Sequence, residues 1–415
     1  MTELTLPMPL GTSPPMAKDA HHGRDFADTE PAPANILAIA FTGSGSEYFR
    51  IWIVNLLLTL VTLGIYYPWA KVRRLRYFHG NTLVGGKPLG FHADPKKMLK
   101  GYLLVGALLI LYSVAGHFNA VAGLVAFVVV MLIWPALLKS SMQFRLANTS
   151  WRGLRFRFTG DLRGAYAAML PLFVPALCLV TAGAVVADQE RPPMWYFYVS
   201  GSVMLGLVVV APWLFQRLKA YQHNHYALAS QHTRFDASIG MFYKLFGEVL
   251  VVYLAISILL GTVVAVAVFV GVAVLGLSGN PFAQGANTKS VWLVVAAVFG
   301  FIALMLLFVS LIKPYVVTRL QNLVWANTQS QDIRIHSKLK ARSMLWLSIK
   351  NWFLVVCTLG LYWPFAAIAR ARMQLEAVGI TSQISLDVLV SDARSHEGEA
   401  AGDAAGDLFG MDIGF

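Results

Sequence analysis

The chain has 415 residues, of which 57% are hydrophobic and only 13% charged, and its mean hydropathy is +0.60. Soluble domains carry about 25% charged residues, so this composition excludes an ordinary soluble domain and indicates a polytopic membrane protein. The net charge of +12 does not by itself indicate a nucleic-acid partner, because the basic residues follow the apolar segments. The two cysteines lie in apolar runs and suggest no disulfide framework.

In chain order, residues 1–35 contain Pro, Ala and Asp without an apolar core, which predicts a disordered tail and no signal peptide. The membrane domain is expected at 36–390, followed by a second disordered tail at 391–415. Roughly 20 helical residues cross a bilayer core. The clearest apolar runs pair into three hairpins and lie at 101–116, 120–138, 165–186, 195–215, 245–277 and 291–312.

The segments that join one hairpin to the next are strongly basic. Residues 71–100, 139–163, 217–244 and 313–342 together hold 24 of the 33 Lys and Arg, against four Asp. Cytoplasmic loops accumulate Lys and Arg because cationic segments resist translocation. We therefore expect all four segments on the cytoplasmic side of a bacterial inner membrane.

These basic segments also resemble one another. An Asn-Thr pair follows a Pro by thirteen residues at Asn81, Asn148 and Asn327, and a weaker copy starts at Pro212. Each copy precedes a short alternating patch, which is typical of a β element. This pattern predicts internal repeats at about 41–94, 95–161, 162–236, 237–336 and 337–390. The expected fold is an all-α polytopic membrane protein of six to eight transmembrane helices, built from repeated helical hairpins with short cytoplasmic β-hairpin elements between them.

The two ends share one motif, "TLVTLGIYYPWAKVRRLRYFHGNT" at 59–82 and "VVCTLGLYWPFAAIARARMQLEA" at 355–377. If each end crossed the membrane once, there would be eight crossings and both termini would be extracytoplasmic. If Thr-Leu-Gly is instead the tip of a short re-entrant or interfacial hairpin, there are six full crossings and both termini are cytoplasmic. The second arrangement is favoured because it places every basic copy on one side, and glycine suits the break in the helix.

The stretch "FTGSGSEYFRIWIVNLLLTLVTLGIYYPWAKVRRLRYFHGNT" at 41–82, with its echo "NWFLVVCTLGLYWP", resembles the YjgN-like family of bacterial inner-membrane proteins. The resemblance covers about 41–390 and implies residence in a bacterial inner membrane. The family is one of unknown function, so it supplies no catalytic or transport residues. The echo departs from the first copy at Ala366, Ala367 and Ala369, where basic or bulky residues thin out.

A few polar residues lie within apolar runs and are candidates for an intramembrane site. They are Asn55, Thr62, Asn351, Thr358 and Glu248. The asparagines precede Gly64 and Gly360 by nine residues each, so they could line a shared cavity or form helix-packing hydrogen bonds. Glu248 follows Lys244 by four residues and could be an interfacial ion pair or a proton or cation site.

A second group of residues is suited to contact anionic lipid headgroups, because juxtamembrane cations are attracted to them. It comprises Arg73, Arg74, Arg76, Arg217, Arg319, Arg370 and Arg372. No catalytic constellation, cofactor motif or convincing metal site is visible, and His-x-His at His223 and His225 is a weak metal signal. We expect no enzyme and no nucleic-acid partner.

Two functions remain open. One is a transporter or channel for a small, possibly anionic, solute, because transporters often combine repeats with broken helices. The alternative is a non-catalytic lipid-binding protein that organises the membrane, with the bilayer and its anionic headgroups as partners.

Overall fold

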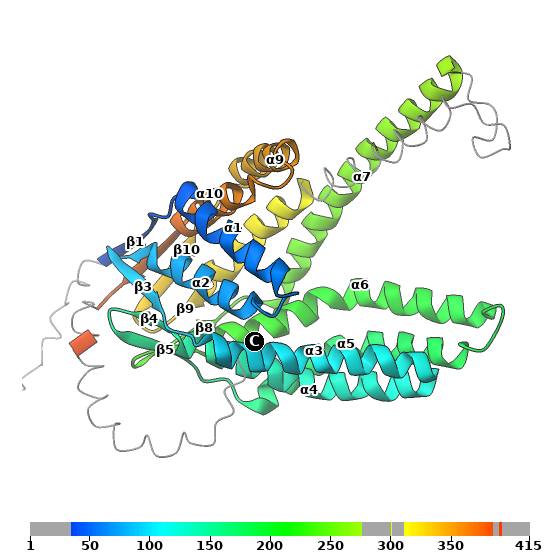
Figure 1. Ribbon diagram of the computed structural model, residues 1–415, viewed down its shortest axis with the longest axis horizontal. Helices are drawn as coiled ribbons and strands as arrows, with labels where there is room; N and C mark the ends of the chain where they lie inside the picture. The colour runs from blue at the N-terminus through cyan, green and yellow to red at the C-terminus, as the bar shows by residue number, and fades with distance from the viewer. Residues whose placement is uncertain (1–34, 276–299, 301–310, 385–389, 392–415) are drawn as a thin grey trace, which may run out of the picture.

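The computed structural model describes residues 35–275, 300, 311–384 and 390–391. The predicted tails lie outside the described residues except at their inner edges, and so does most of the apolar run expected at 291–312. The strands gather at one end of the molecule, and the long helices run away from them (Figure 1). Five helices among the described residues are long and apolar enough to cross a membrane.

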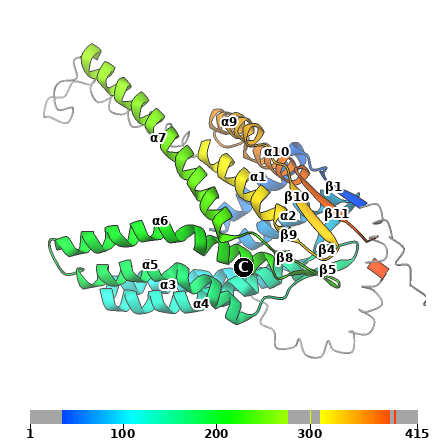
Figure 2. The same ribbon diagram turned by 180° about the vertical axis from the view of Figure 1, so that it is seen from behind.

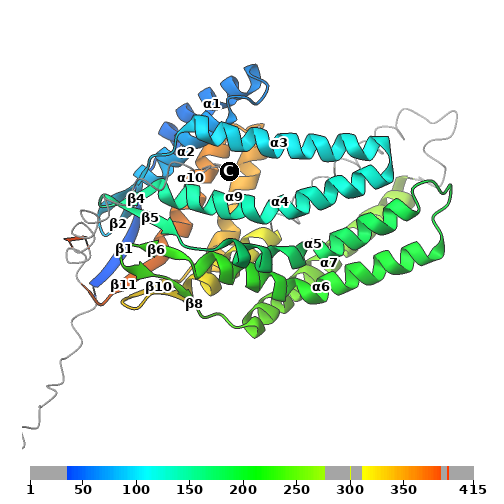
Figure 3. The same ribbon diagram turned by 90° about the horizontal axis from the view of Figure 1, so that it is seen from below.

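The described chain forms consecutive units, each with two helices followed by one to three strands. The first comprises α1 (Gly45–Val61), α2 (Tyr67–Gly80), β2 (Thr82–Val84) and β3 (Lys87–Phe91). The second comprises α3 (Pro95–Phe118), α4 (Ala120–Ala147), β4 (Thr149–Trp151) and β5 (Leu154–Phe158). The third comprises α5 (Leu162–Val185), α6 (Met194–His223), β6 (Tyr226–Leu228), β7 (Gln231–His232) and β8 (Arg234–Phe235). Figure 3 shows α3, α4, α5 and α6 lying side by side.

The fourth unit comprises α7 (Ile239–Leu275), a helix over residues 311–326, β9 (Thr328–Gln329) and β10 (Ile333–Ser337). The fifth comprises α9 (Ala341–Cys357), α10 (Trp363–Glu376) and β11 (Val378–Ser382). Its missing second strand is supplied by the start of the described chain, β1 (Asn35–Phe41), which pairs with β11. As a result α1 packs beside α10, as Figure 2 shows from behind.

The strands of the described residues belong to one antiparallel sheet of 11 strands in the order β7-β6-β5-β4-β3-β2-β1-β11-β10-β9-β8. The two ends of this order, β7 and β8, are separated in the chain only by Thr233. The sheet therefore curves back on itself as a near-barrel. Such closure leaves few free edges, which is how short strands avoid pairing with other chains.

The expectation of an all-α protein with six to eight spans is wrong. The alternating patches after the first four copies do form strands, whereas the patch expected after the last copy, at 383–390, lies mostly outside the described residues. The strands join across the described chain into one sheet, and the described residues contain five candidate spans: α3, α4, α5, α6 and Ile239–Val263 of α7. The strands are two to seven residues long, so their pattern predicts local hairpins only. Which distant hairpins pair is decided by tertiary packing.

One backbone hydrogen bond, repeated in each unit, attaches the sheet to the ends of the helices. The amide that follows a strand donates to the carbonyl at the end of a helix, at 2.8–2.9 Å, in five places: Thr42 to Asn81, His92 to Asn148, Thr159 to His225, Asp236 to Asn327 and Lys338 to Ala377. Buried phenylalanines occupy four of these junctions, at Phe41, Phe91, Phe158 and Phe235. The apolar core is thus distributed over the junctions.

The second helix of each unit carries a buried proline, at Pro68, Pro135, Pro212, Pro314 and Pro364. In α2 and α10 the proline opens the helix, whereas in α4 and α6 it lies inside a longer one. Proline suits a first helical turn because its missing N–H has no partner there. The short helix pairs at the two ends therefore correspond to the strand-side part of the long pairs.

Candidate functional site

The two short helix pairs turn in the same way. Thr62 closes the turn between α1 and α2, and Thr358 closes the turn between α9 and α10. The Thr62 hydroxyl donates to Leu58 O at 2.7 Å and accepts from Tyr66 N at 3.0 Å; that of Thr358 donates to Leu354 O at 2.6 Å and accepts from Tyr362 N at 3.0 Å. Both threonines are satisfied within their own turns, so neither is available as a free polar group.

The tip of each turn is apolar and exposed. Leu63 and Leu359 are 93% and 95% exposed, and both have φ of 49°. The following residues, Gly64 and Gly360, have φ of 92°, a conformation that side chains with a Cβ rarely adopt. The glycines therefore allow the reversal, and the leucines stand at its outer end.

The two asparagines differ in how they are satisfied. Asn55 Oδ1 accepts from Arg73 Nη1 at 3.4 Å. Asn351 Nδ2 donates to Ala366 O at 3.5 Å, but its buried Oδ1 has no donor within the described structure. The residue 18 positions after Asn351, where Arg73 stands relative to Asn55, is Ala369. Because alanine has no side-chain donor, Asn351 Oδ1 lacks the hydrogen bond that Arg73 gives to Asn55 Oδ1.

The polar residues suggested by sequence do not converge on one cavity. Asn55 and Thr62 are bonded within the first helix pair, and Asn351 and Thr358 within the last. Glu248 lies elsewhere, 3.5 Å from Arg319 in an ion pair. The partner of Glu248 is Arg319 and not Lys244, the residue from which the sequence predicted an interfacial ion pair.

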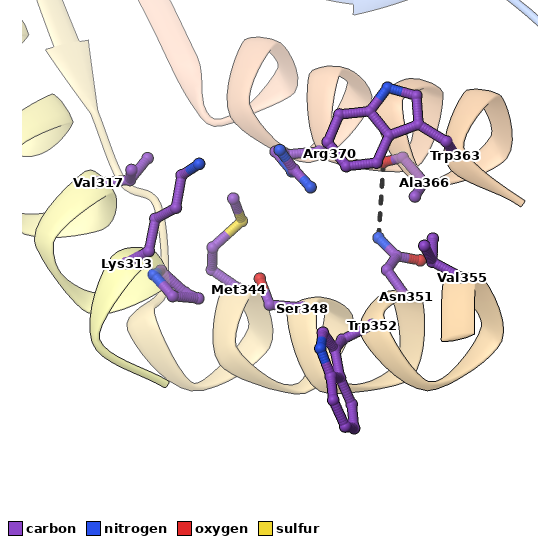
Figure 4. Close-up of a pocket in the computed structure, with 11 residues that line it drawn as sticks. Lys313, Val317, Met344, Ser348, Asn351, Trp352, Val355, Trp363, Ala366 and Arg370 are labelled. Atoms are coloured by element: carbon purple, nitrogen blue, oxygen red, sulfur yellow. Dashed lines mark hydrogen bonds between the residues drawn. The ribbon is translucent and has the colours of Figure 1, made fainter. Parts of the chain in front are cut away.

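One cavity of about 280 Å³ does adjoin Asn351 (Figure 4). It lies between α9, α10 and the helix over residues 311–326. Its walls are Lys313, Pro314, Val317, Met344, Ser348, Asn351, Trp352, Val355, Trp363, Ala366 and Arg370. Lys313, Ser348 and Arg370 lie around the same space in Figure 4. We call this space the Asn351 cavity.

The arginines suggested as lipid contacts fall into two groups. Arg76 and Arg372 hold the fold: Arg76 donates to Ala93 O at 3.1 Å, and Arg372 donates to Gly43 O at 2.9 Å. These are equivalent contacts to the loops that precede α3 and α1. Arg319 is engaged by Glu248, and Arg73 by Asn55.

The remaining arginines lie against aromatic rings. Arg74, Arg217 and Arg370 lie over Phe78, Trp213 and Trp363, at 5.6, 5.0 and 5.9 Å from the ring centroids. Within the described part of the chain none of the three has a carboxylate partner. A cation on an aromatic face remains able to bind an anion.

Two cations of the short helix pairs, Arg370 in α10 and Lys71 in α2, lie close to other cations. Burial, and then the charge of Arg74, lowers the pKa of Arg370. Burial, and then the charge of Arg145, lowers the pKa of Lys71. Partly desolvated cations that repel one another gain from a bound anion. Sequence reasoning missed Lys313 and Ser348 as companions of Arg370; the only signal was the alanine at 369, where the first copy has Arg73.

Among the residues described, no group of three or more His, Cys, Asp or Glu side chains could hold a metal ion. His223 is instead buried and accepts or donates a hydrogen bond with Thr328 Oγ1 at 3.2 Å. Its ring also lies against Trp325 and Phe235. It joins the third unit to the fourth.

Comparisons with known proteins agree with the membrane character. The chain is 26% identical to "Inner membrane protein YjgN" of Salmonella typhimurium over 80% of this chain and 85% of that protein. It is 28% identical to the protein of the same name in Escherichia coli O157:H7, over 42% of this chain and 43% of that one. No solved structure matches. With five apolar helices, this places the chain among inner-membrane proteins. A family model described as "Bacterial protein of unknown function (DUF898)" matches residues 36–408, so the chain belongs to that family.

Proposed function

We propose that this protein is a non-enzymatic, lipid-binding protein that organises anionic lipid at the cytoplasmic face of the inner membrane. Its strand end faces the cytoplasm, because the segments around the strands carry most of the Lys and Arg. The pairing of Asn35 with Ser382 supports this orientation, since it holds both ends of the described chain on the same side of the molecule. Both termini are then cytoplasmic.

The short helix pairs enter the bilayer and return. Helices α1 and α9 have 17 residues each, and α2 and α10 have 14. At 1.5 Å per residue these lengths are about 26 and about 21 Å, less than the roughly 30 Å of a hydrocarbon core. The exposed tips at Leu63 and Leu359 then lie in hydrocarbon.

The observation that carries the proposal is a set of cations without carboxylate partners in the middle of α2 and α10. Arg74 and Arg370 lie close enough for the charge of one to lower the pKa of the other. Neither pairs with a carboxylate among the residues the structure describes. At the level of the headgroups, lipid phosphates would supply the missing anions, each cation gaining on the order of 1 kcal/mol.

A second candidate function is transport of a small anionic solute, and the feature that favours it is the series of five helix–strand units. We interpret these units as internal repeats, because the same junction hydrogen bond recurs in all five. Transporter folds are often built from repeats with interrupted helices. This candidate lacks its expected site, since the polar residues of the two ends are bonded within separate helix pairs.

Spin-labelled lipids in reconstituted bilayers test the proposal. We expect the immobilised fraction of phosphatidylglycerol to exceed that of phosphatidylcholine around the wild type, and the excess to shrink with salt, because exposed charges are screened. The double variant Lys71→Gln, Arg74→Gln should lose much of the excess. Equal immobilisation of both lipids around the wild type would overturn the proposal. Salt-insensitive uptake of anions into the same vesicles would favour the transport candidate.

A further inference from the structure

We infer that the Asn351 cavity is a binding site for one anionic glycerophospholipid whose headgroup carries a hydroxyl. The inference rests on the proposed function and deepens it, because it assigns a single lipid to a defined place. It concerns Lys313, Ser348, Asn351 and Arg370, which surround the cavity.

The first argument is that the side-chain amide oxygen of Asn351, Oδ1, lacks a hydrogen-bond donor among the described residues. The residue is only 3% exposed, and its Oδ1 has no hydrogen-bond donor in the described structure. Leaving a buried acceptor unpaired is costly, so such a group marks a place where a partner is expected. A hydroxyl group on a ligand in the adjoining cavity would supply that donor.

The second argument is an internal comparison. In the first helix pair, Arg73 reaches back 18 residues and donates to Asn55. In the last pair the corresponding position is Ala369, which cannot donate. The two helix pairs have the same backbone arrangement, but Asn55 has a donor within the chain, whereas Asn351 Oδ1 is left to accept from a ligand.

The third argument is charge. Lys313 lies on the helix over residues 311–326, and Arg370 on α10, and both line the cavity. No carboxylate of the described chain pairs with either of them. Two cations beside a neutral hydroxyl, Ser348, match a phosphodiester, whose oxygens accept from all three.

The fourth argument separates a lipid from a soluble phosphodiester. Trp352, Val355 and Trp363 form an apolar part of the wall. Trp363 is 48% exposed, and the neighbouring Val356 and Phe353 are 50% and 60% exposed, so the wall continues into a surface suited to hydrocarbon. Indole rings favour the headgroup level of a bilayer.

The headgroup chemistry follows. Phosphatidylcholine has no hydrogen-bond donor for Asn351. The ammonium of phosphatidylethanolamine could donate, but it would lie beside Lys313 and Arg370 and be repelled. A glycerol headgroup offers hydroxyl donors with a net negative charge, which suits all four polar groups.

The test counts lipids retained by the full-length protein. The protein is reconstituted in equal parts phosphatidylglycerol and phosphatidylcholine, extracted into mild detergent and weighed by native mass spectrometry. We expect one phosphatidylglycerol to remain on the wild type, and retention to fall roughly tenfold or more in Lys313→Gln, Arg370→Gln, which removes both juxtamembrane cations. The decisive variant is Ala369→Arg, which supplies Asn351 with the donor that Arg73 gives Asn55, so that a lipid hydroxyl is no longer needed there. It should lose the lipid while melting no lower than the wild type in lipid-free detergent.

The matched control is Arg73→Ala, which removes a cation from the equivalent position of the first helix pair. It should retain the lipid. A loss in Arg73→Ala as large as that in Lys313→Gln, Arg370→Gln would mean that retention reflects only the general charge of the basic region, so the cavity inference would fall while the proposed function stood. Full retention in Ala369→Arg would also overturn it. Displacement of the lipid by glycerophosphoglycerol or inorganic phosphate would assign the site to a soluble anion and overturn the lipid assignment.

Discussion

Asn35 lies opposite Ser382 in the register that joins β1 to β11, so residues near the two ends of the described chain are neighbours in the sheet. The same strand β1 pairs through its second half with β2, where Phe41 lies opposite Thr82. One strand thus completes the last helix–strand unit and opens the first. Because β1 pairs with both β11 and β2, the continuity of the sheet depends on this one strand.

Removing the side chain of Phe41 should therefore destabilise the whole fold. Phe41 is 3% exposed and packs with Tyr48 and Ile368, which come from α1 and α10. We expect Phe41→Ala to lower the free energy of unfolding by about 3–5 kcal/mol, the range for a buried phenylalanine. Unfolding by denaturant in detergent measures this. Ile36→Ala on the same strand is the control, because Ile36 is 76% exposed and should change little. Similar losses of stability in both variants would show that β1 stabilises the fold through its backbone pairing and not through the buried side chain of Phe41.

The turn glycines should not tolerate a Cβ. Gly360 has φ of 92°, so Gly360→Ala is strained although nothing lies within 4 Å of the added atom. We expect a loss of at least about 1 kcal/mol. Gly106→Ala, inside α3 and also facing open space, is the control and should be neutral or slightly stabilising. Thermal unfolding of the two variants measures the difference. An unchanged melting temperature for Gly360→Ala would show that the turn rearranges without loss of stability.

Stability should fall in mild acid because of His79. Burial lowers the pKa of His79 below its usual 6.5, and the ring nitrogen Nδ1 lies 2.8 Å from Leu75 O. The unfolded chain then binds a proton more readily than the folded one, so stability is present above about pH 6.5 and is lost as the pH falls through and below that value. Unfolding curves across this range should show a shallower dependence for His79→Gln. An identical dependence in the variant would assign the effect to other groups.

The orientation can be measured with single cysteines. In a background with Cys178 and Cys357 replaced by serine, cysteines at Gly80 and Glu376 should react with a membrane-impermeant reagent only after the inner membrane is permeabilised. A cysteine at Glu190, between α5 and α6, should react from outside. All three positions are exposed. If Gly80 and Glu376 reacted from opposite sides, the short pairs would cross the membrane, and the proposed re-entry would be wrong.

Much of the local structure was predictable. The apolar runs at 101–116 and 120–138 correspond to α3 and α4, and the alternating patches correspond to strands, because hydrophobic periodicity and helix length are local properties. The Asn-Thr pairs mark helix ends because Asn81, Asn148 and Asn327 each bond back to a carbonyl four residues earlier. The shared turn of the two ends followed from Thr-Leu-Gly in both copies.

The sequence by itself therefore determined the membrane class, the helix pairs and the uneven distribution of basic residues. Only the tertiary structure decided that the strands form one curved sheet, that β1 joins β11, and that Asn351 keeps an unpaired oxygen where Asn55 has Arg73. The physical reason is that a strand of two to seven residues has too little local information to choose a partner hundreds of positions away. A hydrogen-bond donor missing from a buried site becomes visible only when its neighbours are in place.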